Sequence, residues 1–443
     1  MNTQRQSRWS GHWLLRDYGM VVALVLLVAL FSWLTLTEQF PTGEDAGRQV
    51  AERVLAQPDS PRGVLVVVRD TPEDWAFAEE VERGVKAGGA TVLARVRGGA
   101  PDVRQAIERI LAEGGTIDAI AANEVTASWS VYDRFPQLDQ VPRVKPEPYP
   151  WPNFLKLSNL LGVANQTAIY ALIAIGMTLV IVTGGIDLSV GSLVALSSVS
   201  TALLLRDWGG GAQAGPAAIV LAALVGTSLC AAAGSLNGVL ITLFRLPPFI
   251  VTLGMMMMAS GLAFRLSEGR SIPELPAGFA WLGRGRMVGV PNPVWLMLGG
   301  YLLAHLCMSR TLLGRYVYAI GGNREAARLS GVAVNRVLLL VYTLSGALAG
   351  LGGLVLTSQL SAGDPKFGQM YELEVIAAVV VGGTSLQGGY GKVFGTLIGA
   401  FIIAVIKNGM NLLNVDPYNQ KIVLGGVLML AVLLDTAKRR SGH

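Results

Sequence analysis

The 443-residue chain is 52% hydrophobic and only 15% charged, with a mean hydropathy of +0.49, a composition that excludes an ordinary soluble protein. Its net charge of +5 is divided unevenly, because residues 38–150 hold 19 of the 30 acidic residues but only 13 of the 35 basic ones. This division indicates an acidic aqueous domain inserted into a basic membrane protein, and it argues against nucleic-acid binding. Long apolar runs without β-barrel alternation predict an all-α polytopic membrane protein around that insertion.

The first apolar run covers residues 19–36 and follows Arg5, Arg8 and Arg16. A cleaved signal peptide is the alternative, but the run is long for one and no small-x-small cleavage site follows it, so a retained anchor is favoured. Basic residues before an anchor favour a cytoplasmic N-terminus. We therefore expect residues 1–37 to form a cytoplasmic N-terminus and the first transmembrane helix.

Residues 38–150 have the pattern of a soluble α/β domain. Apolar strand patterns at 63–70, 90–96 and 117–123 alternate with helical patterns at 73–87 and 101–112, which predicts a βαβαβ unit with parallel strands. No Gly-x-Gly follows the first strand, so the unit does not have the pattern of a dinucleotide site. A Pro-rich stretch, "VPRVKPEPYPWPNF", is expected to return to the membrane as an extended linker. Topology places this insertion outside the cytoplasm.

Residues 151–443 are expected to form a membrane core with nine further membrane segments. The predicted segments are 157–182, 188–205, 217–244, 248–266, 294–308, 337–358, 375–382, 393–413 and 422–434. With the first anchor they make about ten transmembrane helices and place both termini in the cytoplasm. The arginines of 309–336 and the basic tail agree with this topology, whereas Arg270, Arg284 and Arg286 disagree with it. Segment 375–382 is too short to span alone, which predicts an extension by its polar flank or a broken, protein-buried helix.

Two apolar runs are interrupted by glycines and short polar residues. In "VIVTGGIDLSV", Gly184 and Gly185 let one helix end, and Asp187 and Ser189 are suited to cap a next helix beginning at Leu188. A structural cap is one interpretation, and a broken helix lining a pathway for a polar solute is a second, compatible one. A second interruption, "VGGTSLQGGYGK", lies at 381–392. The candidate pathway residues are Gly184, Gly185, Asp187, Ser189, Asn237, Gly382, Gly383, Thr384, Ser385, Asn408 and Asn411.

Lys407, Asn408 and Asn411 form the most polar face of any predicted crossing. Snorkelling of the lysine or hydrogen bonding between helices is one interpretation, and direct contact with solute is the other. The connection 314–336 contains a separate helical pattern, in which Asn323 is suited to cap a short helix with Glu325 in its first turn and Gly331 beyond its end. This helix is either a solvated loop element or a docking site for a partner.

Four stretches carry a resemblance to a known family. They are "GMTLVIVTGGIDLSVGSLVALS", "GRYVYAIGGNREAARLSGVAVN", "YELEVIAAVVVGGTSLQGGYGKVFGTLIGA" and "NGMNLL". In this order they resemble the ribose/xylose/galactose-type permeases, the membrane subunits of bacterial ABC importers for monosaccharides. The resemblance implies a homodimer of ten-helix subunits with a central pathway, lying in the bilayer of the bacterial inner membrane. It also implies a cytoplasmic partner with two ATP cassettes and a periplasmic sugar-binding protein.

The same resemblance implies that the short helix in the cytoplasmic connection couples the permease to its ATPase. The residues matched to that role are Gly322, Asn323, Glu325, Ala326, Ala327, Arg328 and Gly331. The insertion departs from the family, because 38–150 is far longer than the first external connection of these permeases. Its "IDAIAANEVTA" is similar to a lobe of the periplasmic sugar-binding proteins, with Glu124 where those proteins commonly have Asp. Since one lobe cannot close on a sugar, our hypothesis is a docking platform or tether for the binding protein.

Enzyme and cofactor chemistry find little support in the sequence. The nearest approach to a P-loop, at Gly391 and Lys392, lacks the first glycine and the hydroxyl ligand, so ATP hydrolysis is expected on a partner. The two cysteines, Cys230 and Cys307, lie in apolar runs, and the three histidines, His12, His305 and His443, are scattered. We therefore expect no catalytic residue, no metal site and no cofactor.

The main alternative is an ion-coupled secondary transporter of small polar solutes. Such a protein is expected to carry ionisable residues in the middle of its crossings, and this chain offers only Asp187, Glu372, Glu374 and Lys407. A membrane-anchored sensor is a second alternative, which explains the insertion but not ten crossings.

Overall fold

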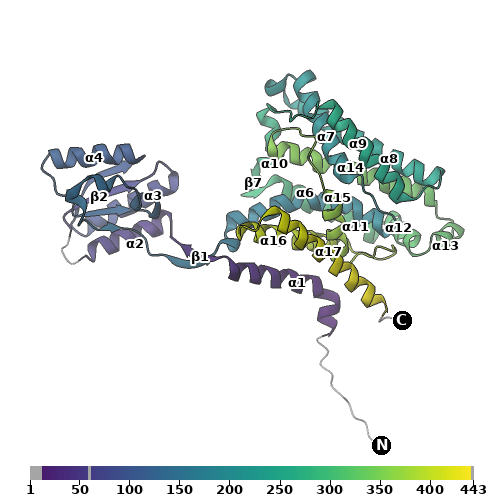
Figure 1. Ribbon diagram of the computed structural model, residues 1–443, viewed down its shortest axis with the longest axis horizontal. Coiled ribbons are helices and arrows are strands. Elements are labelled where there is room, and N and C mark those ends of the chain that lie inside the picture. Colours follow the sequence, from purple (N-terminus) through teal and green to yellow (C-terminus); the bar gives the residue numbers. More distant parts are fainter. Residues whose placement is uncertain (1–11, 58–60, 441–443) are drawn as a thin grey trace, which may run out of the picture. The chain divides into compact units, whose positions relative to one another are not determined.

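The computed structural model describes residues 12–57 and 61–440, which form two compact units. One unit is helical and comprises Met1–Thr35 with Asn153–His443, and the other is the α/β unit Leu36–Pro152 (Figure 1). Arg5, Arg8 and His443, on which the sequence analysis drew, lie outside the described residues.

The α/β unit contains the predicted parallel sheet. Its strands are β2 (Gly63–Val68), β3 (Thr91–Arg97), β4 (Ala119–Ala122) and β5 (Arg143–Val144), in the order β3-β2-β4-β5. All pairs are parallel, as predicted for the three strands of the βαβαβ pattern. Every residue of β2 is buried, which explains its unbroken apolar sequence, since helices cover both faces of the sheet.

Three helices flank this sheet, and two of them are predicted from the sequence. The predicted ones are α3 (Pro72–Ala87) and α4 (Ala100–Ala112), which pack against opposite faces. The third, α2 (Gly43–Leu55), was missed. The Pro-rich stretch, which the sequence predicts to be an extended linker, also contains a strand. This strand, β6 (Tyr149–Pro152), pairs antiparallel with β1 (Leu36–Gln39). Two residues that were assigned to the membrane anchor, Leu36 and Thr37, therefore lie in a strand.

The helical unit begins with α1 and resumes after the α/β unit. Its longer helices are α1 (His12–Leu34), α6 (Leu157–Val182), α7 (Val190–Leu203), α8 (Pro216–Leu243), α9 (Pro248–Leu266), α11 (Asn292–Arg310), α12 (Leu312–Gly322), α14 (Val334–Leu360), α15 (Tyr371–Val381), α16 (Val393–Leu412) and α17 (Pro417–Arg440). The helical unit also has two short helices, α10 (Ala280–Arg284) and α13 (Arg324–Leu329). A further short helix, α5 (Glu124–Ala127), belongs to the α/β unit. A π-helical segment, Leu204–Trp208, continues α7.

Six described helices are long and apolar enough to cross a membrane, or seven if the bent pair α11 and α12 counts as one span. The six are α6, α7, α8, α9, α14 and α16. The apolar parts of α1 and α17 are shorter. Helix α15 has 11 residues and begins at Tyr371, four residues before the predicted segment. The structure therefore shows a largely helical membrane protein with six or seven candidate spans, fewer than the ten predicted.

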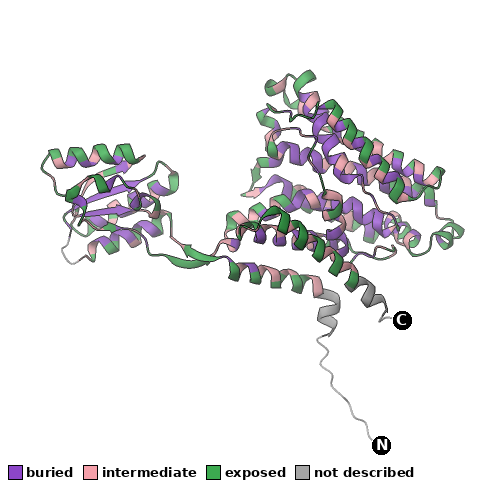
Figure 2. Ribbon diagram, viewed as in Figure 1, coloured by how far each residue is buried: buried purple, intermediate pink, exposed green. Residues whose placement is uncertain are grey.

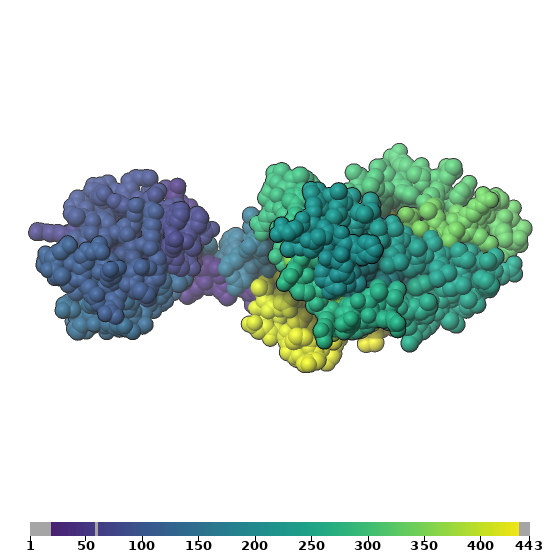
Figure 3. Space-filling view, turned by 90° about the horizontal axis from the view of Figure 1, so that it is seen from above, coloured from purple at the N-terminus to yellow at the C-terminus, as the bar shows by residue number. Residues whose placement is uncertain are grey.

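Burial divides these helices into an inner and an outer set. Helix α6 is buried along most of its length, and α14 along much of its own, whereas α8 and α9 carry many exposed apolar side chains (Figure 2). Exposed apolar side chains also cover α17, which lies at the surface of the helical unit in the space-filling view (Figure 3). Such outer faces suit contact with lipid or with another membrane chain, because neither requires polar cover.

Helices α8 and α14 are in close backbone contact. A Cβ added at Gly346 would collide with the carbonyl of Cys230, and one added at Gly234 would collide with the carbonyl of Tyr342. Small residues therefore let the two backbones approach, which is a common way for membrane helices to associate. This contact holds α14 beside the residues of the candidate site.

Replacement of Gly346 by Val is expected to destabilise the helical unit, because the added side chain has no room between α8 and α14. Overpacking of this kind costs about 1–3 kcal/mol. Thermal unfolding of the detergent-purified protein measures the effect. Gly254→Val is the matched control, since Gly254 lies on α9 with open space around its Cα. Equal melting temperatures for the two variants would contradict the close helix contact.

Candidate solute pathway and coupling site

The first helix interruption is built around a buried carboxylate, that of Asp187. One oxygen, Oδ1, accepts hydrogen bonds from the backbone N–H of Ser189 at 3.0 Å and from its hydroxyl at 2.6 Å. The other, Oδ2, accepts from the hydroxyl of Ser345 on α14 at 2.8 Å. All three side chains are fully buried. The carboxylate thus has hydroxyl and amide partners in place of a cation.

The predicted cap is present in a different form. Helix α7 begins at Val190, not at Leu188, and its N-cap residue Ser189 makes no side-chain capping bond. Asp187 instead bonds the N–H two residues ahead, as aspartates do in tight turns. The carboxylate therefore stabilises the turn that precedes the helix.

Two further side chains lie next to this carboxylate, and each has one buried polar atom without a hydrogen-bond partner among the described residues. Asn237 on α8 donates to the Ser189 hydroxyl at 3.1 Å, but its own Oδ1 is buried without a hydrogen bond. The hydroxyl of Tyr342 on α14 is likewise buried and unpaired, and it lies against Gly185. Unpaired buried polar atoms cost stability and are rare in folded proteins. Their presence here points to a functional role for the cluster.

The two glycine interruptions, far apart in sequence, lie side by side. The backbone N–H of Gly389 donates to the carbonyl of Val182 at 2.9 Å, at the end of α6. A Cβ added at Gly388 would lie 2.9 Å from the nitrogen of Gly184. Gly382–Ser385, the earlier part of the second interruption, includes a buried Thr384 whose hydroxyl has no partner among the described residues. The structure therefore brings the two predicted interruptions together.

A third segment joins them at the end of α12. A Cβ at Gly321 would collide with the carbonyl of Val182 and the nitrogen of Gly389. The hydroxyl of Tyr318, one turn earlier, donates to the carbonyl of Gly391 at 2.7 Å. The chain then passes from Gly322 directly into the short helix α13. A rigid backbone contact thus links the candidate coupling helix to both interruptions.

Helix α13 has the local structure expected of the coupling unit. Asn323 accepts from the N–H of Ala326 at 2.9 Å as its N-cap, and Gly331 closes the end of the helix with a φ of +86°. Ala327 is buried against the helical core, whereas Leu329 is 78% exposed. Glu325 and Arg328 form an exposed ion pair. The helix is therefore fixed on one side and presents an apolar side chain on the other.

The polar face of α16 lies elsewhere and is occupied by contacts between helices. Lys407 forms an ion pair with Glu374 on α15 at 3.0 Å and contacts the hydroxyl of Tyr170 at 3.2 Å. Asn408 exchanges two hydrogen bonds with Asn159, at 2.9 and 3.0 Å. These contacts agree with the interhelical interpretation. No hydrogen bond among the described residues joins this face to the Asp187 cluster.

Asn411 is also engaged outside the cluster, because its Oδ1 accepts from Gln420 at 2.8 Å. Sequence reasoning missed Ser345, Tyr342 and Asn159. Each lies in an apolar helix outside the two interruptions, with no capping or glycine signal that marks it. Only the long-range contacts reveal its role.

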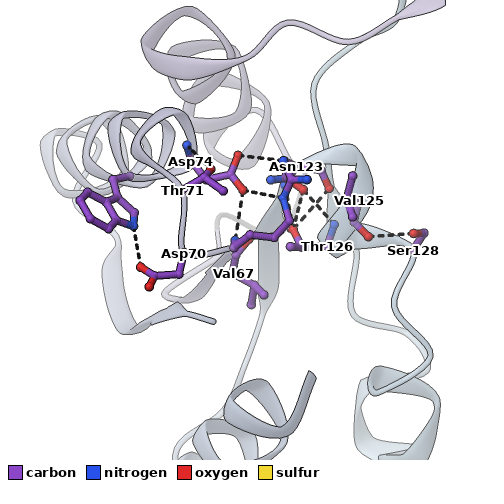
Figure 4. Close-up of polar contacts among 10 residues, drawn as sticks. Val67, Asp70, Thr71, Asp74, Asn123, Val125, Thr126 and Ser128 are labelled. Carbon is purple, nitrogen blue, oxygen red and sulfur yellow. Dashed lines mark hydrogen bonds and ion pairs between the residues drawn. The ribbon is translucent and has the colours of Figure 1, made fainter. Parts of the chain in front are cut away.

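The carboxyl edge of the sheet in the α/β unit holds a second group of polar residues (Figure 4). Asp74 accepts from Arg69 Nε at 2.8 Å, a hydrogen bond that raises the pKa of that guanidinium. Trp75 donates to Asp70 at 3.0 Å. Asn123, which follows β4, accepts from the N–H of Thr126 and caps a short helix. These groups mostly bind each other, so the edge is organised as local structure.

Glu124 stands where periplasmic sugar-binding proteins commonly have an Asp. Its carboxylate forms an ion pair with Lys145 at 2.7 Å. Within the described residues no group of three His, Cys, Asp or Glu side chains is placed to hold a metal ion. Cys230 is buried and Cys307 partly exposed, and neither is in a disulfide.

These features define a multi-span membrane protein with a polar broken-helix centre, and comparison with known proteins assigns the family. Residues 159–432 match the family model described as the branched-chain amino acid transport system / permease component. Because this match covers more than half of the chain, the chain belongs to that family of transport permeases. The matched residues lie in the helical unit.

Curated relatives agree with this assignment. The ribose import permease protein RbsC of Escherichia coli (strain K12) is 45% identical over 292 residues, which cover 65% of this chain and 88% of the relative. RbsC of Bacillus subtilis (strain 168) is 45% identical over 289 residues, covering 65% and 87%. The L-arabinose transport system permease protein AraH of E. coli (strain K12) is 34% identical over 290 residues, covering 66% and 86%. No solved structure matches. The chain is thus a permease of the ribose/arabinose type and not itself an ATPase.

Substitution of Asp187 by Ala is expected to lower the stability of the helical unit, since it leaves the hydroxyls of Ser189 and Ser345 without their acceptor. Unpaired buried groups of this kind cost about 1–3 kcal/mol each. Asp187→Asn is the matched control, because its amide oxygen retains an acceptor for Ser189. Thermal unfolding and solute uptake are measured in parallel. Unchanged unfolding with loss of uptake would show that the carboxylate serves the pathway and not the fold.

Proposed function

We propose that this chain is the transmembrane subunit of an ABC importer for a monosaccharide. The description of the family model mentions amino acids, whereas the relatives at 34–45% identity are named as permeases for ribose and L-arabinose. These relatives match nearly their whole length, which supports a sugar as the solute. The ion-coupled alternative loses support because Lys407 and Glu374 neutralise each other.

The proposed topology has ten membrane crossings, which add α1, α15, α17 and the α11–α12 pair to the helices that pass by length and composition. Both termini then lie in the cytoplasm of a bacterial cell, and the membrane is the inner one. Three domain-level parts follow from this topology. They are the N-terminus with the first helix (1–37), the extracytoplasmic insertion (38–150) and the permease core (151–443). The core includes the cytoplasmic connection with α13.

The partners in this proposal are a cytoplasmic ATP-binding subunit with two ATP cassettes, a periplasmic sugar-binding protein and a second copy of the chain. The α/β unit serves as a docking platform or tether for the binding protein. In support, its polar sheet edge is occupied by internal contacts, and a single lobe offers no cleft that could close on a sugar. The bilayer contacts the exposed apolar faces of α8 and α17.

The observation that carries the proposal is the contact between α12 and the two interruptions. A permease without its own ATPase needs a mechanical connection to its motor. Helix α13 follows α12 at once, and Gly321 of α12 is in backbone contact with Val182 and Gly389. A displacement of α13 by a partner would therefore reach both interruptions through rigid backbone. The pathway residues named from sequence lie in or beside these interruptions, with the exception of Asn408 and Asn411.

The proposed function predicts that uptake depends on partner proteins. Sealed vesicles containing the purified chain alone should not concentrate labelled D-ribose or L-arabinose under a pH or sodium gradient. Vesicles that also contain its cognate ATPase and binding protein should concentrate one of these sugars when ATP is supplied. Accumulation by the chain alone would overturn the proposal.

A substitution at Gly331 tests the coupling role of α13. Gly331→Val forces a β-branched residue into a left-handed conformation and should displace α13. We expect uptake to fall by about tenfold or more while the ATPase continues to hydrolyse ATP, since coupling between sites is typically worth such a factor. Gly425→Val on α17 is the control, because Gly425 has open space around it and an ordinary φ. Normal uptake by the Gly331 variant in the assembled complex would show that α13 does not couple the permease to the ATPase.

A further inference from the structure

A cavity of about 470 Å³ lies between α7, α9 and the segment 361–370 that joins α14 to α15. Its volume falls within the range of about 300–1,000 Å³ that is usual for small-molecule sites. Four polar side chains line it, those of Ser192, Ser260, Gln369 and Glu372. None of these four residues is among the candidate pathway residues named from the sequence.

The cavity lies at the level of the first interruption. Ser192 is in the first turn of α7, five residues after Asp187. Ser260, together with Met256, belongs to the middle part of α9, which spans Pro248–Leu266. Since α9 is long enough to cross a membrane, its middle part lies near the centre of the bilayer. The cavity is therefore at membrane depth, and it opens at the surface of the helical unit, where Met257 and Met370 are exposed.

One wall of the cavity is irregular backbone held against α7. The N–H of Asp364 donates to the hydroxyl of Ser198 at 3.3 Å. The backbone of Gly368 presses on Gly191, so that a Cβ at either position would collide with the carbonyl of the other. Non-helical backbone at membrane depth is tolerated where it is covered by protein or lines a water-filled cavity. The segment 361–370 meets both conditions here.

The polar groups of the cavity are not used by the fold. Within the described residues, the side chains of Ser192, Ser260 and Gln369 make no hydrogen bond, and the carboxylate of Glu372 accepts only from its own backbone N–H. A carboxylate and an amide facing lipid would be costly. They therefore face water or a polar ligand. Since their hydrogen-bonding capacity is open, they are available to a solute.

The rest of the lining is apolar and suits one class of solute. Met256, Met257 and Phe367 lie beside the polar groups. A monosaccharide has C–H faces that pack against such side chains and hydroxyls that donate to carboxylate and amide oxygens. Among the described residues, the lining has no Lys or Arg side chain that could pair with an anionic solute such as a sugar acid. The mixed lining thus favours a neutral polyol over a lipid or an anion.

We propose that this cavity holds the monosaccharide during its passage, with Glu372 accepting hydrogen bonds from the sugar hydroxyls. The proposal rests on the proposed function and adds a place for the solute within it. Helix α7 connects this place to the first interruption, because Gly191 and Ser192 follow Ser189 without a break. Movement at the interruption would therefore shift a wall of the cavity.

Thiol accessibility in the full importer tests the position of the cavity. Cysteine is introduced as Ser260→Cys in a Cys307→Ser background, where the remaining Cys230 is buried. A charged methanethiosulfonate reagent reacts with thiols that reach water. We expect it to label Ser260→Cys and to reduce uptake of labelled D-ribose or L-arabinose by about tenfold or more, since it fills the site. Leu303→Cys, at an exposed apolar position on α11, is the control and should stay unlabelled.

Glu372→Gln tests the carboxylate. Loss of hydrogen bonds to the carboxylate is expected to reduce uptake at subsaturating sugar by about tenfold, and thermal unfolding of the variant is measured in parallel. Failure of Ser260→Cys to react, or full uptake after its labelling, would overturn the cavity proposal, as would wild-type uptake by Glu372→Gln. If the parental complex imports neither sugar with ATP and binding protein present, the proposed function itself falls. Uptake by the parental complex therefore distinguishes failure of the cavity proposal from failure of the proposed function.

Discussion

Three segments of the helical unit meet through bare backbone, and the rest of the candidate site depends on this contact. They are 182–185 at the end of α6, 321–322 at the end of α12 and 388–389 before α16. Glycines leave no side chains between them, so a hydrogen bond from Gly389 to Val182 and direct contact with Gly321 become available. Backbone packed on backbone is stiff, because there are no rotamers to absorb a displacement. A push on α13 is thus carried to two helix ends at once.

The polar cluster beside this contact is suited to rearrangement, unlike the ion pair on α16. Asp187 is held by the hydroxyls of Ser189 and Ser345, which rotate at little cost and also accept hydrogen bonds. Lys407 and Glu374 form a charged pair whose separation at membrane depth would leave two uncompensated charges. The molecule therefore has one polar centre with adaptable partners and one with fixed partners. The adaptable centre lies where the backbone contact delivers movement.

Sequence reasoning found the elements marked by local signals and missed those defined by distant contacts. The parallel sheet, the two interruptions and the capped helix at Asn323 follow from strand patterns, glycines and capping residues. Helix α2 was missed although Ala46, Val50 and Val54 repeat with helical spacing, because short apolar side chains in a polar stretch give a weak pattern. Ser345 could not be found from sequence, since its partner Asp187 lies 158 residues away. The short segment predicted at 375–382 is part of helix α15, which begins earlier, at Tyr371.

Helix α7 connects the two halves of the proposed mechanism. Its first residues follow the turn of Asp187, and its next residues, Gly191 and Ser192, form a wall of the cavity. Gly191 is wedged against Gly368, so any shift of the start of α7 must move the irregular segment 361–370 or separate from it. Either response changes the opening between α7 and α9. A chain of contacts therefore runs from α13 through α12, the end of α6 and the start of α7 to the cavity, and each contact in it is made by backbone or by a short side chain.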